Sequence, residues 1–103
     1  MIKNLNASEI AKRNDLCRTT LMGCKVVMTP GVAHSSDKDT ILSAVRTFNS
    51  FTPDNDPHRE HDFGSFEVNG TKCFWKFDYY DQDFNQFCEN GNRVLTIMLA
   101  SEY

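Results

Sequence analysis

Two stretches of alternating apolar and polar residues stand on either side of an Asn-Gly pair. They are Phe63–Val68 and Thr71–Phe77, and Asn69-Gly70 separates them. Alternation indicates a strand with one buried face, and Asn-Gly is the residue pair that two-residue hairpin turns prefer. The pattern therefore predicts a β-hairpin over residues 63–77.

The two-residue turn also fixes the register of this hairpin. It places Val68 opposite Thr71 and Gly64 opposite Trp75, so that the glycine leaves room for the indole. One face then carries Val68, Phe66, Cys73, Trp75 and Phe77. On the other face we expect a cross-strand ion pair between Glu67 and Lys72.

Two helices are predicted nearer the N-terminus. Residues 7–21 have apolar positions near helical spacing, with Asn6 as a cap, Gly23 as the stop, and Lys12, Arg13, Asp15 and Arg18 facing water. Residues 36–48 have the cleanest helical period in the chain. Two prolines and three Asx residues in the segment 51–57 end that helix and favour successive turns.

Two further strands complete the expected fold. Residues 24–29 are followed by the turn pair Pro30-Gly31, and residues 93–100 are apolar on both faces, which favours a central position beneath helices. We expect one α+β domain spanning residues 1–103. Two helices pack on one face of an antiparallel sheet of about four strands, and the last three strands form a meander.

Composition supports a folded domain and restricts the classes of protein. The 103 residues are 40% hydrophobic and 24% charged, which is ordinary for a globular protein. No stretch is apolar for long enough to be a signal peptide core or a membrane span, so we expect a cytoplasmic protein without a membrane partner. In that compartment the four cysteines, Cys17, Cys24, Cys73 and Cys88, are expected to be reduced.

Charge is distributed unevenly. Residues 1–50 carry seven Lys/Arg and four Asp/Glu, whereas residues 51–103 carry four Lys/Arg and ten Asp/Glu. An acidic half repels nucleic acid and suits a basic or metal partner. Three basic residues on the first helix, Lys12, Arg13 and Arg18, are a minor alternative for nucleic-acid contact, but no RNA-binding signature accompanies them.

The hairpin register predicts where the acidic residues gather. Continued past the strands, it puts Asp62 opposite Phe77 and His61 opposite Asp78, so two acidic segments meet at the end of the sheet away from the turn. Their mutual repulsion favours a binding role over a folding role. The expected partner-binding residues are Asp54, Asp56, Glu60, Asp62, Asp78, Tyr80, Asp81 and Asp83.

The same loop offers a second interpretation. His58, Glu60, His61 and Asp62 have the side chains of a divalent-metal site, although their spacing fits no established motif. If they bound a metal, the protein would be a metal-dependent hydrolase. We expect no other cofactor, and no catalytic residues are assigned because the chain has no phosphate loop or nucleophile elbow.

Several segments resemble a family of small proteins of unknown function, found mainly on proteobacterial plasmids and other mobile elements. The resemblance covers about residues 10–103, and its most specific pieces are Pro53-Asp54-Asn55-Asp56-Pro57 and Glu60-His61-Asp62-Phe63-Gly64. Val27–Val32, Phe74–Asp81 and Arg93–Ala100 share it. No activity or site residue comes with that family.

What the resemblance implies is a genomic setting. Small accessory proteins in that setting are often inhibitors of host defence, such as anti-CRISPR or anti-restriction proteins; this is an analogy. We therefore favour a non-enzymatic protein that binds and inhibits a host protein or nucleoprotein complex with a basic surface. The metal-dependent hydrolase is the alternative.

Overall fold

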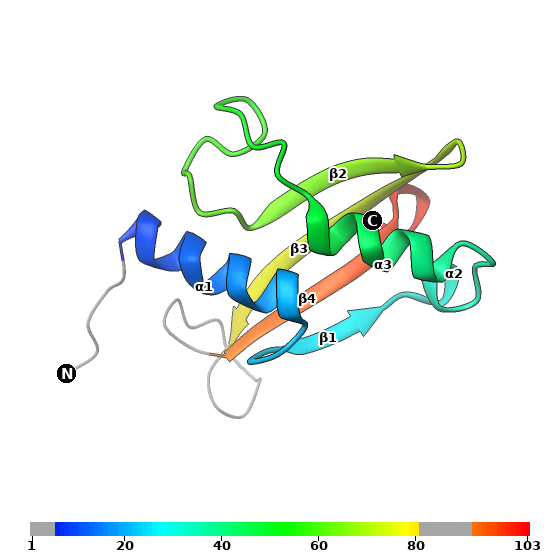
Figure 1. Ribbon diagram of the computed structural model, residues 1–103, viewed down its shortest axis with the longest axis horizontal. Coiled ribbons are helices and arrows are strands. Elements are labelled where there is room, and N and C mark those ends of the chain that lie inside the picture. The colour runs from blue at the N-terminus through cyan, green and yellow to red at the C-terminus, as the bar shows by residue number, and fades with distance from the viewer. Residues whose placement is uncertain (1–5, 81–91) are drawn as a thin grey trace.

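Helices cover one face of a four-stranded sheet in the computed structural model, which describes residues 6–80 and 92–103 (Figure 1). The helices are α1 (Ala7–Thr20), α2 (Pro30–Ala33) and α3 (Lys38–Thr47), and η1 (Ala100–Glu102) is a short 3₁₀ turn. The strands are β1 (Lys25–Met28), β2 (Phe63–Val68), β3 (Thr71–Tyr80) and β4 (Asn92–Leu99). The α+β class and the number of strands are as the sequence predicts. No described helix is long and apolar enough to cross a membrane.

The strand order is β1-β4-β3-β2, and the last three strands form the predicted antiparallel meander. β1 joins the sheet parallel to β4, which makes the sheet mixed rather than fully antiparallel. Parallel neighbours need a long connection, and the chain between β1 and β4 includes two helices and the hairpin. β4 occupies the predicted central position.

The hairpin has the predicted register. Val68 pairs with Thr71 and Gly64 pairs with Trp75, and both turn residues, Asn69 and Gly70, have positive φ. A Cβ atom added at Gly64 would collide with the Trp75 indole, so the glycine provides the space that the sequence predicted. Glu67 and Lys72 are cross-strand neighbours as predicted but form no ion pair; Lys72 Nζ instead lies 5.5 Å from the centre of the Phe74 ring.

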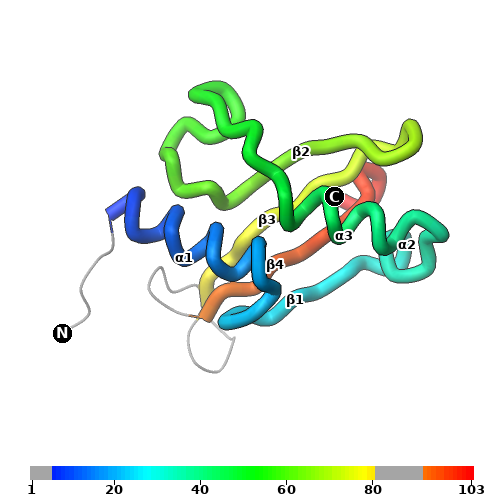
Figure 2. Tube along the Cα trace, in the orientation of Figure 1, coloured from blue at the N-terminus to red at the C-terminus, as the bar shows by residue number. Residues whose placement is uncertain are grey.

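Figure 2 shows α1 and α3 lying over one face of the sheet, and the core cluster takes its residues from both layers. Trp75, at 0% exposed, is its largest fully buried side chain. Ile10 and Cys17 of α1 and Ile41 and Val45 of α3 belong to the same cluster. Among the described residues, the helices therefore pack on the face that the hairpin register assigned to the core.

The first helix differs from its prediction in three ways. It ends at Leu21, which has φ 58° and donates its N–H to Cys17 O, so the left-handed stop comes before Gly23. That reversal brings the Cα atoms of Cys17 and Cys24 to 6.1 Å, and the two residues form a disulfide instead of staying reduced. Arg18, expected to face water, is 3% exposed. Cys73 is a buried free thiol.

One carboxylate joins the C-terminal turn to the start of α2. Glu102 accepts hydrogen bonds from the Thr29 hydroxyl (2.6 Å), from Gly31 N (2.9 Å) and from Leu99 N (3.0 Å). These donors, the Thr29 hydroxyl foremost, lower the pKa of Glu102. The sequence predicted a turn at Pro30-Gly31; a short helix begins there instead, and Glu102 accepts the N–H of Gly31 in its first turn.

Candidate functional site

The two acidic segments meet at the end of the sheet opposite the hairpin turn. Phe77 N donates to Asp62 O at 2.9 Å, which continues the hairpin pairing by the predicted one step. The pKa of Asp62 is raised, mainly because the carboxyl is half-buried and further because the Asp56 and Asp78 carboxylates lie near it. Three of the acids named from the sequence are thus brought together.

The remaining predicted partner-binding residues have different surroundings. Asp54 is exposed in the loop, and Glu60 is half-buried. Asp78 forms an ion pair with Lys76, whose Nζ is 2.9 Å from the carboxylate. Tyr80 is half-buried at the end of β3. Asp81 and Asp83 lie outside the described residues.

Asp56 has a structural position rather than a surface position. It is 6% exposed, and its Oδ1 accepts a hydrogen bond from His61 N at 3.2 Å. Its Oδ2 lies 3.5 Å from His61 Nε2. In this conformation Asp56 closes the loop 48–62, which connects α3 to β2, and a partner could not reach its carboxylate directly.

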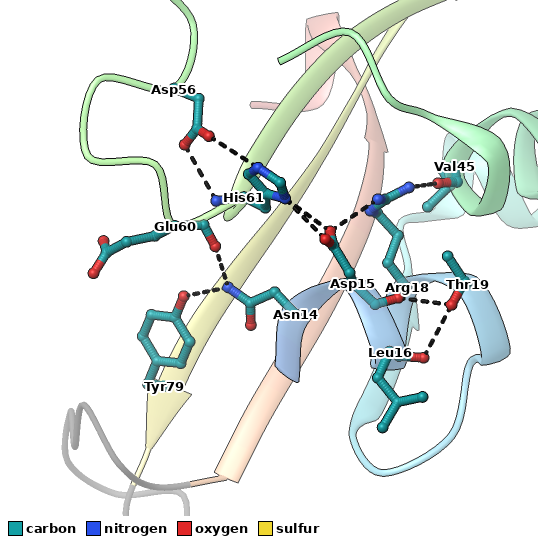
Figure 3. A network of polar contacts seen from close by, with 10 residues as sticks. All are labelled: Asn14, Asp15, Leu16, Arg18, Thr19, Val45, Asp56, Glu60, His61 and Tyr79. Atoms are coloured by element: carbon teal, nitrogen blue, oxygen red, sulfur yellow. Dashed lines mark hydrogen bonds and ion pairs between the residues drawn. The ribbon is translucent and has the colours of Figure 1, made fainter. Parts of the chain in front are cut away.

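His61 connects that loop to α1 (Figure 3). Its Nδ1 lies 2.9 Å from one carboxylate oxygen of Asp15 and 3.0 Å from the other. The ring stacks on Phe51, with centroids 3.7 Å apart and planes 3° from parallel. His61 also has φ 53°, a left-handed conformation uncommon outside glycine. Both ring nitrogens therefore face carboxylates, one from each element.

Arg18 connects the His61–Asp15 contact to the core. Its Nη2 donates to Asp15 at 3.1 Å and its Nη1 donates to Val45 O at 2.7 Å. The guanidinium lies 5.0 Å from the Trp75 ring centre and 5.5 Å from that of Phe51. Because the guanidinium is held by a carboxylate, a carbonyl and two rings, it is not available to nucleic acid as the minor alternative required.

Asn14 joins three parts of the chain through one side chain. Its Nδ2 donates to Tyr79 Oη at 2.8 Å and to Glu60 O at 3.0 Å, and its Oδ1 accepts from Arg93 Nε at 2.8 Å. Asn14 is 0% exposed; its bonds to Tyr79 and Arg93 are buried, and its bond to Glu60 O is partly buried. Figure 3 shows Tyr79 and Glu60 converging on the amide from one side.

Burial changes the proton affinity of two of these partners. It raises the pKa of Tyr79 to about 12, although the hydrogen bond from Asn14 opposes the shift. Burial also lowers the pKa of Arg93, and Nη2 of this guanidinium is buried without a hydrogen-bond partner. Both shifts disfavour the charged form, as desolvation does.

The four predicted metal ligands do not form a compact ligand set. His61 faces Asp15 and Asp56, His58 is exposed, and Asp62 lies at the sheet end. Within residues 6–80 and 92–103, no group of three or more His, Cys, Asp or Glu side chains could hold a metal ion. A metal-dependent hydrolase stays a prediction, and a thermal-shift screen with Mn²⁺ and Zn²⁺ would test it.

The sequence reasoning missed Asn14, Asp15 and Arg93 as parts of this site. A signal was present for Asn14 and Arg18: they fall four and eight residues after buried Ile10, on the helix face that also carries Cys17. Polar residues at core spacing indicate a buried network when several recur. No sequence pattern could identify the hydrogen-bond partners of Asn14 and Arg18, because most of these partners lie on other helices and strands.

Comparison with known proteins identifies a family but no individual related protein. Residues 28–102 match the family model described as "Protein of unknown function (DUF3768)". The chain belongs to this family. The matched residues include the loop 48–62 and all three strands of the meander, whereas α1 precedes them. No curated protein and no solved structure matches the chain.

Proposed function

We propose that this member of the family is a non-enzymatic binding protein whose acidic sheet end contacts a basic surface of a host protein or nucleoprotein complex. The observation that carries the proposal is the half-buried Asp62, which has Asp56 and Asp78 beside it. Burial and these two neighbouring carboxylates all disfavour the ionised form of Asp62, and a basic partner would favour it. We propose a cytoplasmic location, although the Cys17–Cys24 disulfide is a feature more usual in oxidising compartments.

A nucleic-acid groove is the basic surface that this chemistry fits best. Carboxylates at the sheet end would occupy phosphate positions on the partner, and the protein would then exclude the partner's nucleic acid. A nuclease of a host defence system has such a groove. The finer proposal is therefore inhibition of a CRISPR or restriction complex, for which the mobile-element resemblance is the motivation.

The test combines capture with protection. Tagged protein is incubated with lysates of bacteria that express defined defence systems, and phage or plasmid survival is measured in the same strains. A triple variant, Asp54→Asn, Glu60→Gln and Asp62→Asn, removes one exposed and two half-buried acids of the loop but leaves Asp56 to close it. We expect the variant to lose both capture and protection while its thermal stability is unchanged or higher.

The matched control carries Asp39→Asn and Glu67→Gln, two exposed acids on other elements. It should keep full capture and protection. Equal loss in the control would show that net charge alone matters. Capture and protection that survive in the triple variant would refute the acidic sheet end as the binding surface.

A further inference from the structure

A recess with basic side chains on both walls runs between α1 and the loop 48–62. Ser8, Lys12 and Asp15 lie on the same face of α1, and Arg59 and His61 face them from the loop. The hollow has a volume of about 600 Å³. A smaller hollow of about 300 Å³ adjoins it and is also lined by Arg59 and His61.

Local backbone geometry places Arg59 at this boundary. Arg59 N donates to Asp56 O at 3.1 Å, which closes a tight turn, and Arg59 has φ 57°. A left-handed residue reverses the direction of the chain after such a turn. The side chain is exposed and lines both hollows, so its guanidinium is accessible from either one.

The charge balance of the recess is positive. Asp15 is its one lining carboxylate; Arg18 pairs with it at 3.1 Å, and His61 Nδ1 lies 2.9 Å from it. Lys12 and Arg59 form no ion pair with any described residue. Two uncompensated cations thus face one hollow from opposite walls, in a protein whose net charge is −3.

We propose that this recess binds the phosphate group of a small phosphate monoester whose alcohol part is apolar. A phosphate dianion can accept the planar guanidinium fork from one wall and the lysine ammonium from the other, with the Ser8 hydroxyl as a further donor. The apolar part would lie against Phe51, Pro53 and Pro57 of the adjoining hollow, whose lining also includes Thr52, Asp56, Arg59 and His61. This site shares the loop 48–62 with the acidic sheet end but would bind its ligand through the basic side chains Lys12 and Arg59.

The experiment is a titration followed by ¹H–¹⁵N NMR, with phenyl phosphate, inorganic phosphate and benzoate as probes at constant ionic strength. We expect saturable shifts at Lys12 and Arg59, with phenyl phosphate binding several-fold more tightly than inorganic phosphate and benzoate more weakly than either. Lys12→Gln and Arg59→Gln should each weaken phenyl phosphate by at least about fivefold.

Lys72→Gln is the matched control, because Lys72 is equally exposed but lies on the sheet away from α1. It should bind like the unaltered protein, and thermal melts should show all three variants folded. Non-saturable shifts, benzoate binding as tightly as phenyl phosphate, or unchanged affinity in the Lys12→Gln, Arg59→Gln double variant would each overturn the proposal. The acidic triple variant should retain phenyl phosphate binding, so the two proposals can fail separately.

Discussion

The two ends of the β2–β3 hairpin are stabilised by different kinds of interaction. At one end, Asn69 and Gly70 reverse the chain within two residues, and both adopt positive φ. At the other end, α1 lies against the loop 48–62, and contacts such as Asn14 to Tyr79 join residues 65 positions apart. The first end depends on backbone conformation and on one exposed side-chain hydrogen bond, from Asn69 Nδ2 to Asp37 Oδ1 at 2.9 Å. The second end depends on side-chain hydrogen bonds in a buried setting.

The difference determines how each end should respond to substitution. A turn residue can be replaced at the cost of its local conformational preference. A buried polar group cannot, because its removal leaves other buried groups without partners. Substitutions at the α1 end should therefore lower the free energy of unfolding most, and substitutions at the turn should lower it least.

The largest effect is expected from Asn14→Ala. Arg93 Nε and Glu60 O both lose their bond to this side chain in a buried site, and a cavity remains. We expect the free energy of unfolding, measured in urea, to fall by about 3 kcal/mol or more. Asn55→Ala is the control: Asn55 also makes side-chain hydrogen bonds, but it is exposed. A loss no larger than the control's would show that the buried network contributes little.

Gly64→Ala tests the middle of the hairpin. The new methyl group would overlap the Trp75 indole, which is 0% exposed and cannot move into solvent. Overpacking of this kind should lower the free energy of unfolding by about 2 kcal/mol. Gly23→Ala gives a contrast: nothing lies within 4 Å of an added Cβ there, and only the positive φ of 80° opposes it, so we expect a smaller loss of about 1 kcal/mol. A stable Gly64→Ala protein would mean that the ring has another place to go.

Alkaline pH should weaken the α1 end selectively. The pKa of Tyr79 is about 12 in the folded protein, whereas an unfolded tyrosine titrates near 10. The folded state therefore keeps a proton that the unfolded state releases, and stability that is complete below about pH 10 is lost as the pH rises toward 12. Urea unfolding from pH 8 to 11 would measure the slope, and Tyr79→Phe should make it shallower. If the slope of the free energy of unfolding against pH is unchanged in Tyr79→Phe, the loss of stability comes from other titrating groups.

The smallest effect is expected from Gly70→Ala at the turn. The added methyl group meets no atom, and only the positive φ of 82° opposes it, so we expect a loss of about 1 kcal/mol. Thermal unfolding followed by circular dichroism would measure it. A loss as large as that of Asn14→Ala would erase the distinction between the two ends.

The sequence predicted most of what depends on neighbouring residues. The hairpin, its register and the Gly64 space opposite Trp75 follow from alternation and one turn pair, because a strand has a side-chain period of two. The same register located the end of the sheet where Asp62 meets Phe77. The central place of β4 followed from its apolar character on both faces.

The tertiary structure alone decided the roles of the polar residues. No pattern in the chain pairs Asn14 with Arg93, 79 positions away, or directs His61 to Asp15, 46 positions away. Nor could it show that β1 runs parallel to β4, or that Arg18 is buried. Periodicity records which side of an element faces the core, but a polar side chain is buried only if packing brings it a partner. That partner is fixed by where other elements lie, and short-range patterns carry no information about their positions.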